Sequence, residues 1–404
     1  MASYIHVPAA APAVPDLHIT VDQHDVEAGS RRLLREMRPH WDPAAVKLKV
    51  FTDGITNKLV GCYVGDSLED VVLVRVYGNK TELFVDRENE LKSFHVLHAH
   101  GCAPRLYCTF QNGLCYKFME GTALDPEHVR DPSVFRLITR QLAKIHTIHA
   151  HNGWIPKPNL WLKLEKYFTL VPTELADECL HARFSMEVPG HQELEQELAW
   201  MKKHLSSLGS PIVLCHNDLL CKNIIYNEKE GQLTELNAST RFFDILTSNY
   251  KVGSSTKKQE PVKHGYSNDV KKTPGHVKFI DYEYAGYNYQ AFDIGNHFNE
   301  FAGINEVDYC LYPDKSLQFQ WLKSYLEALK EYKGLSAEVI EKEVEVLYFQ
   351  VNQFALASHF FWGLWALIQT KYSTIDFDFL GYAVVRFRQY FKMKTEVMNL
   401  KLPE

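Results

Sequence analysis

Apolar residues in the first part of the chain gather in short runs bounded by polar or turn-forming residues. Five of these runs are rich in β-branched and aromatic residues, which is typical of β-strands. They are residues 48–51, 57–64, 70–77, 106–110 and 114–118. The last two flank Asn112-Gly113, a typical hairpin turn, and residues 82–99 have helical spacing. This part of the chain therefore predicts a β-rich lobe.

Beyond Gly121 the pattern changes, because apolar residues recur at every third or fourth position. In residues 133–149 the apolar face consists of Phe135, Ile138, Leu142, Ile145 and Ile148. Similar helical patterns cover 193–206, 316–332 and 340–393, with a break near 373–376. This part predicts a mainly helical lobe, and the whole chain is therefore expected to have an α+β fold with two lobes.

Two segments differ from these lobes in composition. Residues 1–19 contain three prolines among several alanines, which predicts a disordered leader. Residues 228–275 are rich in Lys, Ser, Thr, Asn and Gly, and they predict a disordered insertion because unstructured connections of this length are unusual in compact domains. We therefore expect an N-terminal lobe over 20–119 and a C-terminal catalytic lobe over 120–404 that carries the insertion.

Composition narrows the function classes. The 404 residues are 46% hydrophobic and 23% charged, as in ordinary soluble proteins, and the formal net charge of −6 disfavours nucleic-acid or anionic-membrane partners. No stretch reaches the about 18–20 apolar residues that span a bilayer, and the N-terminus does not resemble a signal peptide. Eight cysteines without a C-x-x-C pair do not indicate a zinc site; they suggest reduced thiols in a cytoplasmic protein.

Two acidic motifs, each preceded by an apolar strand-like run, indicate the chemistry. They are His216-Asn-Asp-Leu-Leu-Cys-Lys-Asn223 and Phe279-Ile-Asp-Tyr-Glu283. Asp218 can accept the proton of an attacking hydroxyl, and Asn223 and Asp281 can hold a metal ion against nucleotide phosphates. Together they are the minimal set for phosphoryl transfer from a metal-bound nucleotide. The alternative for the first motif is a simple helix cap.

An ionic residue, Arg75, lies in the middle of the apolar run 70–77. A charge in such a strand needs a partner, and in a nucleotide kinase the partners would be phosphates and a helix carboxylate, here Glu90. The alternative is an edge strand with Arg75 directed to water. The loop 53–57, which ends at Asn57, could cover phosphates with backbone amides, or it could be only a turn.

Two further patterns suggest a substrate wall. In a helix, Asp293, Asn296 and Glu300 would share one face, which suits an active-site wall or, alternatively, a solvated surface. Trp362 and Trp365 are neighbours at i, i+3 in an aromatic stripe. Such a stripe is often core, but Trp faces also attract small organic cations, for which Glu300 could supply the counter-charge.

These motifs resemble the choline/ethanolamine kinase family. The resemblance rests on 216–223, on 280–298 with its Ile-Asp-Tyr-Glu-Tyr start, on 51–59 and on 358–365, and it runs from about Tyr4 to the C-terminus. It implies a two-lobed, protein-kinase-like fold that binds ATP and Mg²⁺ in its N-terminal lobe and cleft. It also implies phosphorylation of ethanolamine, the first step of the CDP-ethanolamine route to phosphatidylethanolamine, and a possible homodimer.

The resemblance also assigns roles by position. Asp218 is the implied base, and Asn223 and Asp281 are the implied Mg²⁺ ligands. The implied ATP-binding residues are Arg75, Glu90, Asn57 and the hinge from Tyr116 to Met119. The implied amine pocket consists of Tyr284, Glu300, Trp362, Trp365 and Tyr382. His216 and Asp293 are the expected structural supports of the catalytic loop.

Two alternatives remain open. A primary ammonium needs hydrogen-bond acceptors and a quaternary one needs an aromatic box; the sequence offers both, so choline kinase activity competes with ethanolamine kinase activity. The insertion at 228–275 is longer than the usual connection in the family, which leaves a non-catalytic form as a second alternative. The retention of Asp218, Asn223 and Asp281 favours a catalytic protein.

Overall fold

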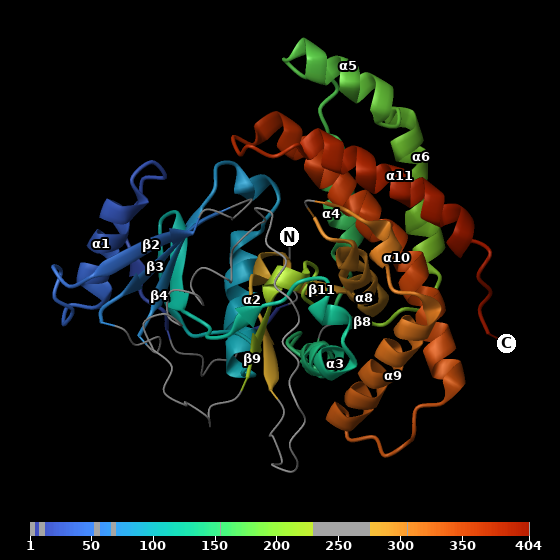
Figure 1. The fold of residues 1–404 in the computed structure, drawn as a ribbon, viewed down its shortest axis with the longest axis horizontal. Coiled ribbons are helices and arrows are strands. Elements are labelled where there is room, and N and C mark those ends of the chain that lie inside the picture. The colour runs from blue at the N-terminus through green and yellow to red at the C-terminus, as the bar shows by residue number, and fades with distance from the viewer. Residues whose placement is uncertain are drawn as a thin grey trace, which may run out of the picture.

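The computed structural model describes residues 5–7, 13–51, 57–65, 70–153, 155–228, 275–304 and 306–403. Figure 1 shows a β-rich N-terminal lobe beside a larger, mainly helical C-terminal lobe. The α+β, two-lobed fold expected from the sequence is confirmed. The predicted insertion lies outside the described residues except at its two ends, residues 228 and 275, and so does the loop 53–56.

The N-terminal lobe is built on a six-stranded sheet with the order β1-β5-β6-β4-β3-β2. Its strands are β1 (Asp16–Leu17), β2 (Lys47–Phe51), β3 (Asn57–Tyr63), β4 (Val72–Tyr77), β5 (Leu106–Phe110) and β6 (Gly113–Lys117). The neighbours are antiparallel except for β1 and β5, which run parallel. All five strands predicted from apolar runs are present, and β5 and β6 form the predicted hairpin.

Two helices accompany this sheet, α1 (Val26–Met37) and α2 (Arg87–Ala99). Val72, Val74 and Val76 of β4 pack in one apolar cluster with Leu33 and Leu34 of α1. Because side chains alternate along a strand, Arg75 is directed to the opposite face of the sheet, away from α1.

The leader is ordered where the structure describes it. Ile5 is buried, and the backbone N–H of His6 donates to the Ala150 carbonyl at 2.6 Å. Asp16 and Leu17 pair with Thr109 and Phe110 of β5. The prediction of a disordered leader over 1–19 is therefore wrong for residues 5–7 and 13–19, because apolar side chains and strand pairing fix them; residues 1–4 and 8–12 lie outside the described part.

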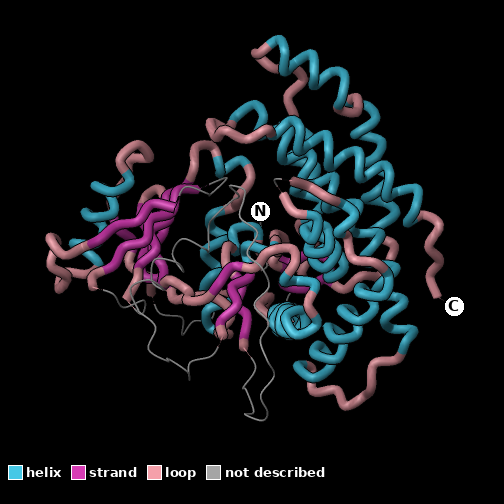
Figure 2. The backbone as a smooth tube through the Cα atoms, viewed as in Figure 1, coloured by secondary structure: helices cyan, strands magenta, loops and turns pink. Residues whose placement is uncertain are grey.

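The C-terminal lobe consists of helices around a long central one (Figure 2). They are α3 (Pro132–His146), α4 (Leu160–Leu170), α5 (Glu178–Glu187), α6 (His191–Ser206), α8 (Gln290–Asn299), α9 (Lys315–Tyr332), α10 (Glu341–Tyr372) and α11 (Phe379–Val397). Every residue of α10 from 350 to 369 is buried, which is typical of a helix enclosed on all sides. It packs against α8, α9 and α11.

Two small sheets carry the acidic motifs. One has the order β10-β9-β7 and the other pairs β11 with β8. Their strands are β7 (Thr122–Ala123), β8 (Ile212–Cys215), β9 (Ile224–Asn227), β10 (His276–Phe279) and β11 (Gly286–Tyr289). Because Ile224 pairs with Phe279, the residues just before β9 and just after β10 lie side by side. This pairing brings the two motifs together.

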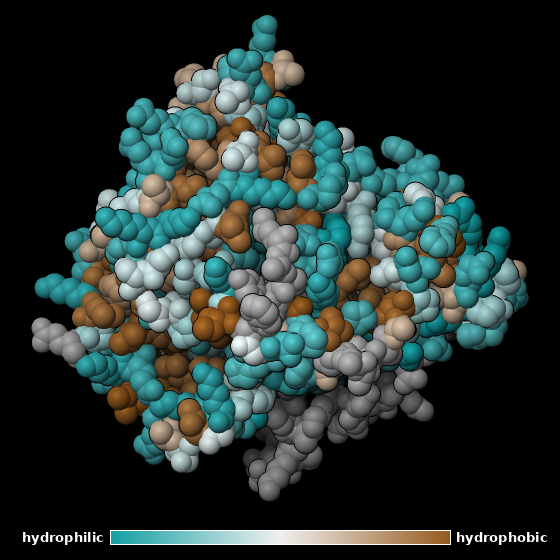
Figure 3. Space-filling view, turned by 180° about the vertical axis from the view of Figure 1, so that it is seen from behind, coloured by the Kyte–Doolittle hydropathy of each residue, from teal (hydrophilic) through white to brown (hydrophobic). Residues whose placement is uncertain are grey.

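None of the helices that the structure describes is both long enough and apolar enough to cross a membrane. The face of the molecule seen from behind is covered mostly by hydrophilic residues, with hydrophobic residues in small groups between them (Figure 3). Such scattered apolar groups are normal on protein surfaces.

Candidate active site

Arg75 is the centre of an ion-pair cluster between the lobes. Its strand, β4, lies between β3 and β6, so the alternative of an edge strand is wrong. Although only 5% exposed, the guanidinium lies 3.2 Å from Glu90 Oε1 and 3.0 Å from Asp281 Oδ1, and it also contacts Glu283. The predicted partnership with Glu90 is confirmed. The pairs with Asp281 and Glu283 connect the N-terminal sheet to the second acidic motif.

Glu283 is a buried carboxylate that several donors share. Arg87 Nη1 lies 3.2 Å from Glu283 Oε2 and 2.8 Å from Glu90 Oε2, and Asn57 Nδ2 donates to Glu283 at 3.1 Å. Burial alone would raise the pKa of Glu283, but Arg75 and Arg87 outweigh it and hold this pKa below its usual value. Glu283 is therefore an ionised anchor, and Asn57, an expected ATP-binding residue, already contributes to holding it.

The catalytic loop after β8 is fixed by backbone hydrogen bonds to Asp293. The N–H groups of His216 and Asn217 donate to the two carboxylate oxygens of Asp293 at 2.9 and 2.7 Å. His216 Nε2 lies 2.9 Å from the Ile280 carbonyl, which joins the loop to the second motif. Asn217 has a positive φ of 65°, an uncommon conformation that these bonds hold in place. The supporting role predicted for His216 and Asp293 stays a prediction, and these hydrogen bonds are consistent with it.

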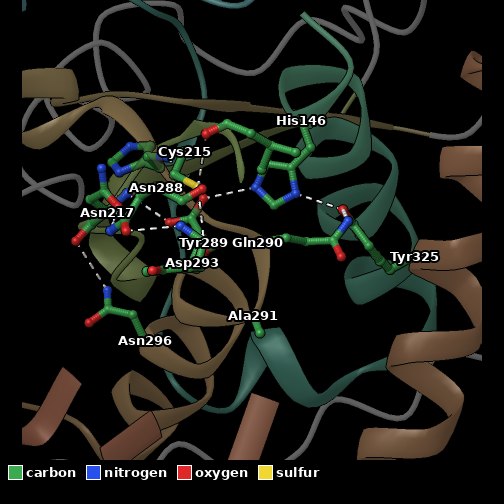
Figure 4. A network of polar contacts seen from close by, with 12 residues as sticks. His146, Cys215, Asn217, Asn288, Tyr289, Gln290, Ala291, Asp293, Asn296 and Tyr325 are labelled. Carbon is green, nitrogen blue, oxygen red and sulfur yellow. Dashed lines mark hydrogen bonds and ion pairs between the residues drawn. The ribbon is translucent and has the colours of Figure 1, made fainter. Parts of the chain in front are cut away.

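Asp293 is itself hydrogen-bonded to a residue of α3, which in turn contacts a residue of α9 (Figure 4). His146 Nε2 lies 3.0 Å from Asp293 Oδ2, and His146 Nδ1 lies 2.6 Å from the Tyr325 hydroxyl. His146, Cys215 and Asp293 also lie close enough to share a metal ion, and all three are buried. Because His146 and Asp293 are already hydrogen-bonded to each other and to neighbours, this group is better explained as a structural network.

Asn223 lies between the two motifs. Its Nδ2 donates to the Asp218 carbonyl at 2.9 Å, and its own carbonyl accepts the N–H of Ile280 at 2.9 Å. The predicted base and both predicted metal ligands are therefore gathered at one place. Asp281, which follows Ile280, has a positive φ of 63°, and its side chain is 35% exposed. Strained backbone of this kind is common at functional sites.

The residues present fit a divalent cation. Within the described residues, the side-chain oxygen of Asn223 has no donor, and Asp281 has an ion pair only through Oδ1, so oxygen ligands of the kind that Mg²⁺ prefers are available. Burial raises the pKa of Asp281 to about 6, although Arg75 opposes the shift. Burial also raises the pKa of Asp218, and the negative charge of Asp281 adds to that rise. A cation would relieve this repulsion.

An aromatic group lies beside the catalytic loop. The rings of Tyr284 and Trp362 meet edge to face with centroids 5.3 Å apart, and those of Trp362 and Trp365 are 5.6 Å apart. Trp365 Nε1 donates to the Tyr284 hydroxyl at 3.1 Å. Trp362 Nε1 donates to Asn296 Oδ1 at 2.8 Å, so the indole orientations are fixed. Three of the five residues predicted for an amine pocket are thus in contact.

Glu300 and Tyr382, the other two predicted pocket residues, share a partner that sequence reasoning missed. Arg386 Nη1 lies 3.1 Å from Glu300 Oε1 and 3.4 Å from the Tyr382 hydroxyl. Both members of the Glu300–Arg386 pair are buried. Glu300 stays the predicted counter-charge for the amine, and the structure adds that one of its carboxylate oxygens is paired with a neighbouring arginine.

The residues expected to hold adenine lie where the lobes join. Tyr116 belongs to β6 and its ring lies 5.7 Å from that of Phe94, and the half-buried Met119 lies between β6 and β7. An open cleft of about 680 Å³ also lies between the lobes, lined by Thr81 and Arg87 on one side and by Tyr372 on the other. This cleft reaches Arg87 of the ion-pair cluster.

Comparisons with known proteins identify the family of this chain. A family model described as choline/ethanolamine kinase matches residues 48–391. Ethanolamine kinase 1 of Mus musculus is 63% identical over 407 residues, covering 100% of both chains, and ethanolamine kinase 2 of Homo sapiens is 56% identical over 397 residues, covering 98% of this chain and 89% of the relative. The chain belongs to the choline/ethanolamine kinase family.

A solved structure of this family supports the same architecture. The ethanolamine kinase of Plasmodium vivax superposes with a TM-score of 0.70 at 25% identity, covering 91% of this chain and 89% of that chain. The choline kinase of Streptococcus pneumoniae, at 15% identity and a TM-score of 0.57, shares the fold. Membership of this family accounts for the two-lobed fold.

Three residues of the candidate site were not predicted from the sequence: Arg87, Glu283 and Arg386. Glu283 lies two residues after Asp281 in a motif that the reasoning singled out. Arg386 lies between the buried residues Val384 and Phe387, the same signal of a charge within an apolar pattern that revealed Arg75. Arg87 carried no comparable signal, because the first turn of a helix is usually solvated.

Proposed function

We propose that this kinase transfers the γ-phosphoryl group of ATP to the hydroxyl group of ethanolamine, giving phosphoethanolamine and ADP. This reaction is the first step of the CDP-ethanolamine route to phosphatidylethanolamine. The observation that carries the proposal is the hydrogen-bonded connection from Asp218 through Asn223 to Ile280, the residue before Asp281. The relatives named ethanolamine kinases, which match nearly the whole chain, support the choice of substrate.

On the phosphate side, Asn223 and Asp281 would hold Mg²⁺ through their side-chain oxygens. When bound, Mg²⁺ neutralises the charge of the nucleotide phosphates. Arg75 is fixed beside Asp281 at 3.0 Å and adds positive charge at the phosphates. Glu90 and Asn57 keep the arginines of this cluster oriented, and the segment from Tyr116 to Met119 receives the adenine ring.

At the reacting centre, Asp218 orients the substrate hydroxyl and accepts its proton while the oxygen forms its bond to the γ-phosphorus. The bond from that phosphorus to the bridging oxygen of ADP breaks. Burial raises the pKa of Asp218, which makes the carboxylate a better proton acceptor than a solvated one. The backbone bonds from His216 and Asn217 to Asp293 hold the loop in this geometry.

On the amine side, the ammonium rests against Tyr284, Trp362 and Trp365, whose ring faces attract cations. Glu300 and Tyr382 supply oxygen acceptors near the same place. The arrangement gives a cation site beside a proton acceptor, as an amino-alcohol kinase requires.

The proposal is tested by measuring ADP release by the purified chain with ATP and Mg²⁺ in the presence of ethanolamine. We expect turnover that depends on the amine and is lost in Asp218→Asn, a variant that keeps the size of the side chain. Release of ADP at the same rate without any amine, or unchanged turnover in Asp218→Asn, would contradict the proposal.

Choline is the second candidate substrate, because an aromatic wall such as Tyr284–Trp362–Trp365 suits a quaternary ammonium. A comparison of kcat/KM for ethanolamine and choline decides between them. We expect a higher value for ethanolamine; a higher value for choline would assign the chain to the other branch of the family.

The non-catalytic alternative is tested by comparing the full chain with a version that lacks residues 232–274. Equal activity of the two would exclude an insertion that disables the enzyme, and activity only in the shortened version would support one. A homodimer and a cytoplasmic location stay predictions, which light scattering of the purified protein and imaging of the tagged protein in cells can test.

A further inference from the structure

Arg386 joins three separate parts of the amine side. It lies on α11 with 2% of its surface exposed. Its Nη1 lies 3.1 Å from Glu300 Oε1, just after α8, and 3.4 Å from the Tyr382 hydroxyl, one turn earlier on α11. Its Nη2 donates to Ser358 Oγ of α10 at 3.1 Å. A single buried guanidinium therefore fixes the relative positions of α8, α10 and α11.

The hydrogen bonds continue from Ser358 into the aromatic wall. Ser358 Oγ donates to Asn296 Oδ1 at 2.7 Å, and Trp362 Nε1 donates to the same oxygen at 2.8 Å. Asn296 Nδ2 in turn donates to the Asn217 carbonyl at 3.4 Å, in the catalytic loop beside Asp218. One continuous network thus runs from Arg386 past Trp362 to the predicted base.

Arg386 holds Glu300 in an asymmetric way. The contact uses only Oε1 of the carboxylate, and no described residue donates to Oε2. Two-point pairing between arginine and a carboxylate would occupy both oxygens, whereas this one-point contact leaves an acceptor for a further N–H. Burial raises the pKa of Glu300 and Arg386 opposes that shift, so the arginine favours the ionised carboxylate.

We propose that Arg386 is a positioning residue that sets the preference for a primary ammonium by holding Glu300 with one carboxylate oxygen left for a substrate N–H. The inference rests on the proposed function and names a determinant of its substrate choice. Ethanolamine offers three N–H donors to that oxygen and choline offers none. A site built to hydrogen-bond a donor discriminates strongly against an analogue without it, because its own polar group then stays unpaired.

The test compares kcat/KM across ethanolamine, N-methylethanolamine, N,N-dimethylethanolamine and choline. For the unaltered chain we expect a decline as N–H groups are replaced. In Arg386→Gln we expect KM for ethanolamine to rise by at least about 10-fold and the decline along the series to flatten, while KM for ATP changes by less than about 2-fold. A purely structural role would lower activity equally for all four amines.

Arg388→Gln is the matched control. It is the same substitution two residues further along the same helix. The side chain of Arg388 is 70% exposed, and its Nη2 makes only a long contact of 3.6 Å with Glu187 Oε2. We expect this variant to keep both the activity and the decline along the amine series.

Arg386→Gln leaves Glu300 buried without its partner, so this variant could lose activity because it does not fold. A second variant separates that effect from a change in substrate preference. The double variant Glu300→Gln with Arg386→Gln removes both charges, so that neither is left buried without a partner. We expect it to fold, as judged by circular dichroism and thermal melting, and to phosphorylate all four amines with little discrimination. If it keeps the decline of the unaltered chain, or if Arg386→Gln loses all four amines equally, the inference is overturned. If the unaltered chain phosphorylates none of the amines, the proposed function fails first and the inference fails with it.

Discussion

The candidate site has a phosphate side and an amine side, and at each of them an arginine pairs with buried carboxylates. The two arginines come from different lobes. On the phosphate side, Arg75 comes from the N-terminal sheet and reaches Asp281 and Glu283 in the C-terminal lobe. On the amine side, both Glu300 and Arg386 belong to the C-terminal lobe. The phosphate side therefore depends on contact between the lobes. The five residues proposed for the amine pocket all belong to one lobe, and Phe84 of the N-terminal lobe packs against them with its ring 6.2 Å from that of Trp365. Nucleotide binding should consequently affect the lobe contact more than the amine pocket.

The largest effect is expected where the phosphate side is broken directly. Asp281→Asn keeps the shape of the side chain but removes the charge of the proposed metal ligand, which also pairs with Arg75. We expect kcat to fall by at least about 10³-fold with little change in folding. The measurement is turnover over a range of Mg²⁺ concentrations, with a thermal melt to verify the fold.

Asp42→Asn, in the exposed turn before β2, is the matched control and should keep normal turnover. Near-normal turnover in Asp281→Asn would remove this residue from the metal site.

The contact between the lobes is tested by Arg75→Met, which keeps an unbranched apolar stem but removes the guanidinium and its charge. It leaves Glu90 and Glu283 buried next to fewer positive charges, so we expect the free energy of unfolding to fall by about 3–5 kcal/mol. Urea unfolding measures this change. Arg140→Met removes an exposed ion pair with Glu331 and should leave stability nearly unchanged. Equal stability of the two variants would show that the buried cluster does not hold the lobes together.

The amine side should respond in binding more than in folding or chemistry. Trp362→Ala removes the central ring of the aromatic wall, and we expect KM for ethanolamine to rise by about 10- to 30-fold with little change in KM for ATP. Trp200→Ala, a similar truncation on α6 outside the pocket, should leave both constants unchanged. A rise in KM for ATP alone would show that Trp362 contributes to ATP binding and not to amine binding.

The smallest expected effect is a pH dependence of the rise in melting temperature that Mg²⁺ causes. Burial raises the pKa of Asp281 from 3.8 to about 6, so proton binding favours the folded state. This contribution to stability is present below the unfolded pKa and is lost as the pH rises through about 6. If Asp281 is a metal ligand as proposed, Mg²⁺ binds its ionised carboxylate and competes with the proton. We therefore expect Mg²⁺ to raise the melting temperature more at about pH 7.5 than at about pH 5; an equal rise at both would argue against Asp281 as a ligand.

The sequence predicted the contacts on the proposed phosphate side better than those on the proposed amine side, for a physical reason. Asp218, Asn223 and Asp281 lie in short motifs next to strands, and the isolated charge of Arg75 demanded a partner. Glu300 was predicted as a counter-charge for the substrate, but its pairing with Arg386 joins residues 86 positions apart and depends on how α8 and α11 pack. The same limit explains the leader, where burial of Ile5 outweighs a composition that suggests disorder.

The central claim is that the gathered Asp218, Asn223 and Asp281 transfer phosphate to an amino alcohol bound beside Trp362. The most direct test is ³¹P nuclear magnetic resonance of the purified chain with ATP, Mg²⁺ and ethanolamine. We expect a phosphoethanolamine signal that grows as the γ-phosphate signal of ATP declines, and no such signal in Asp218→Asn. Formation of inorganic phosphate alone, or no loss of ATP, would contradict it.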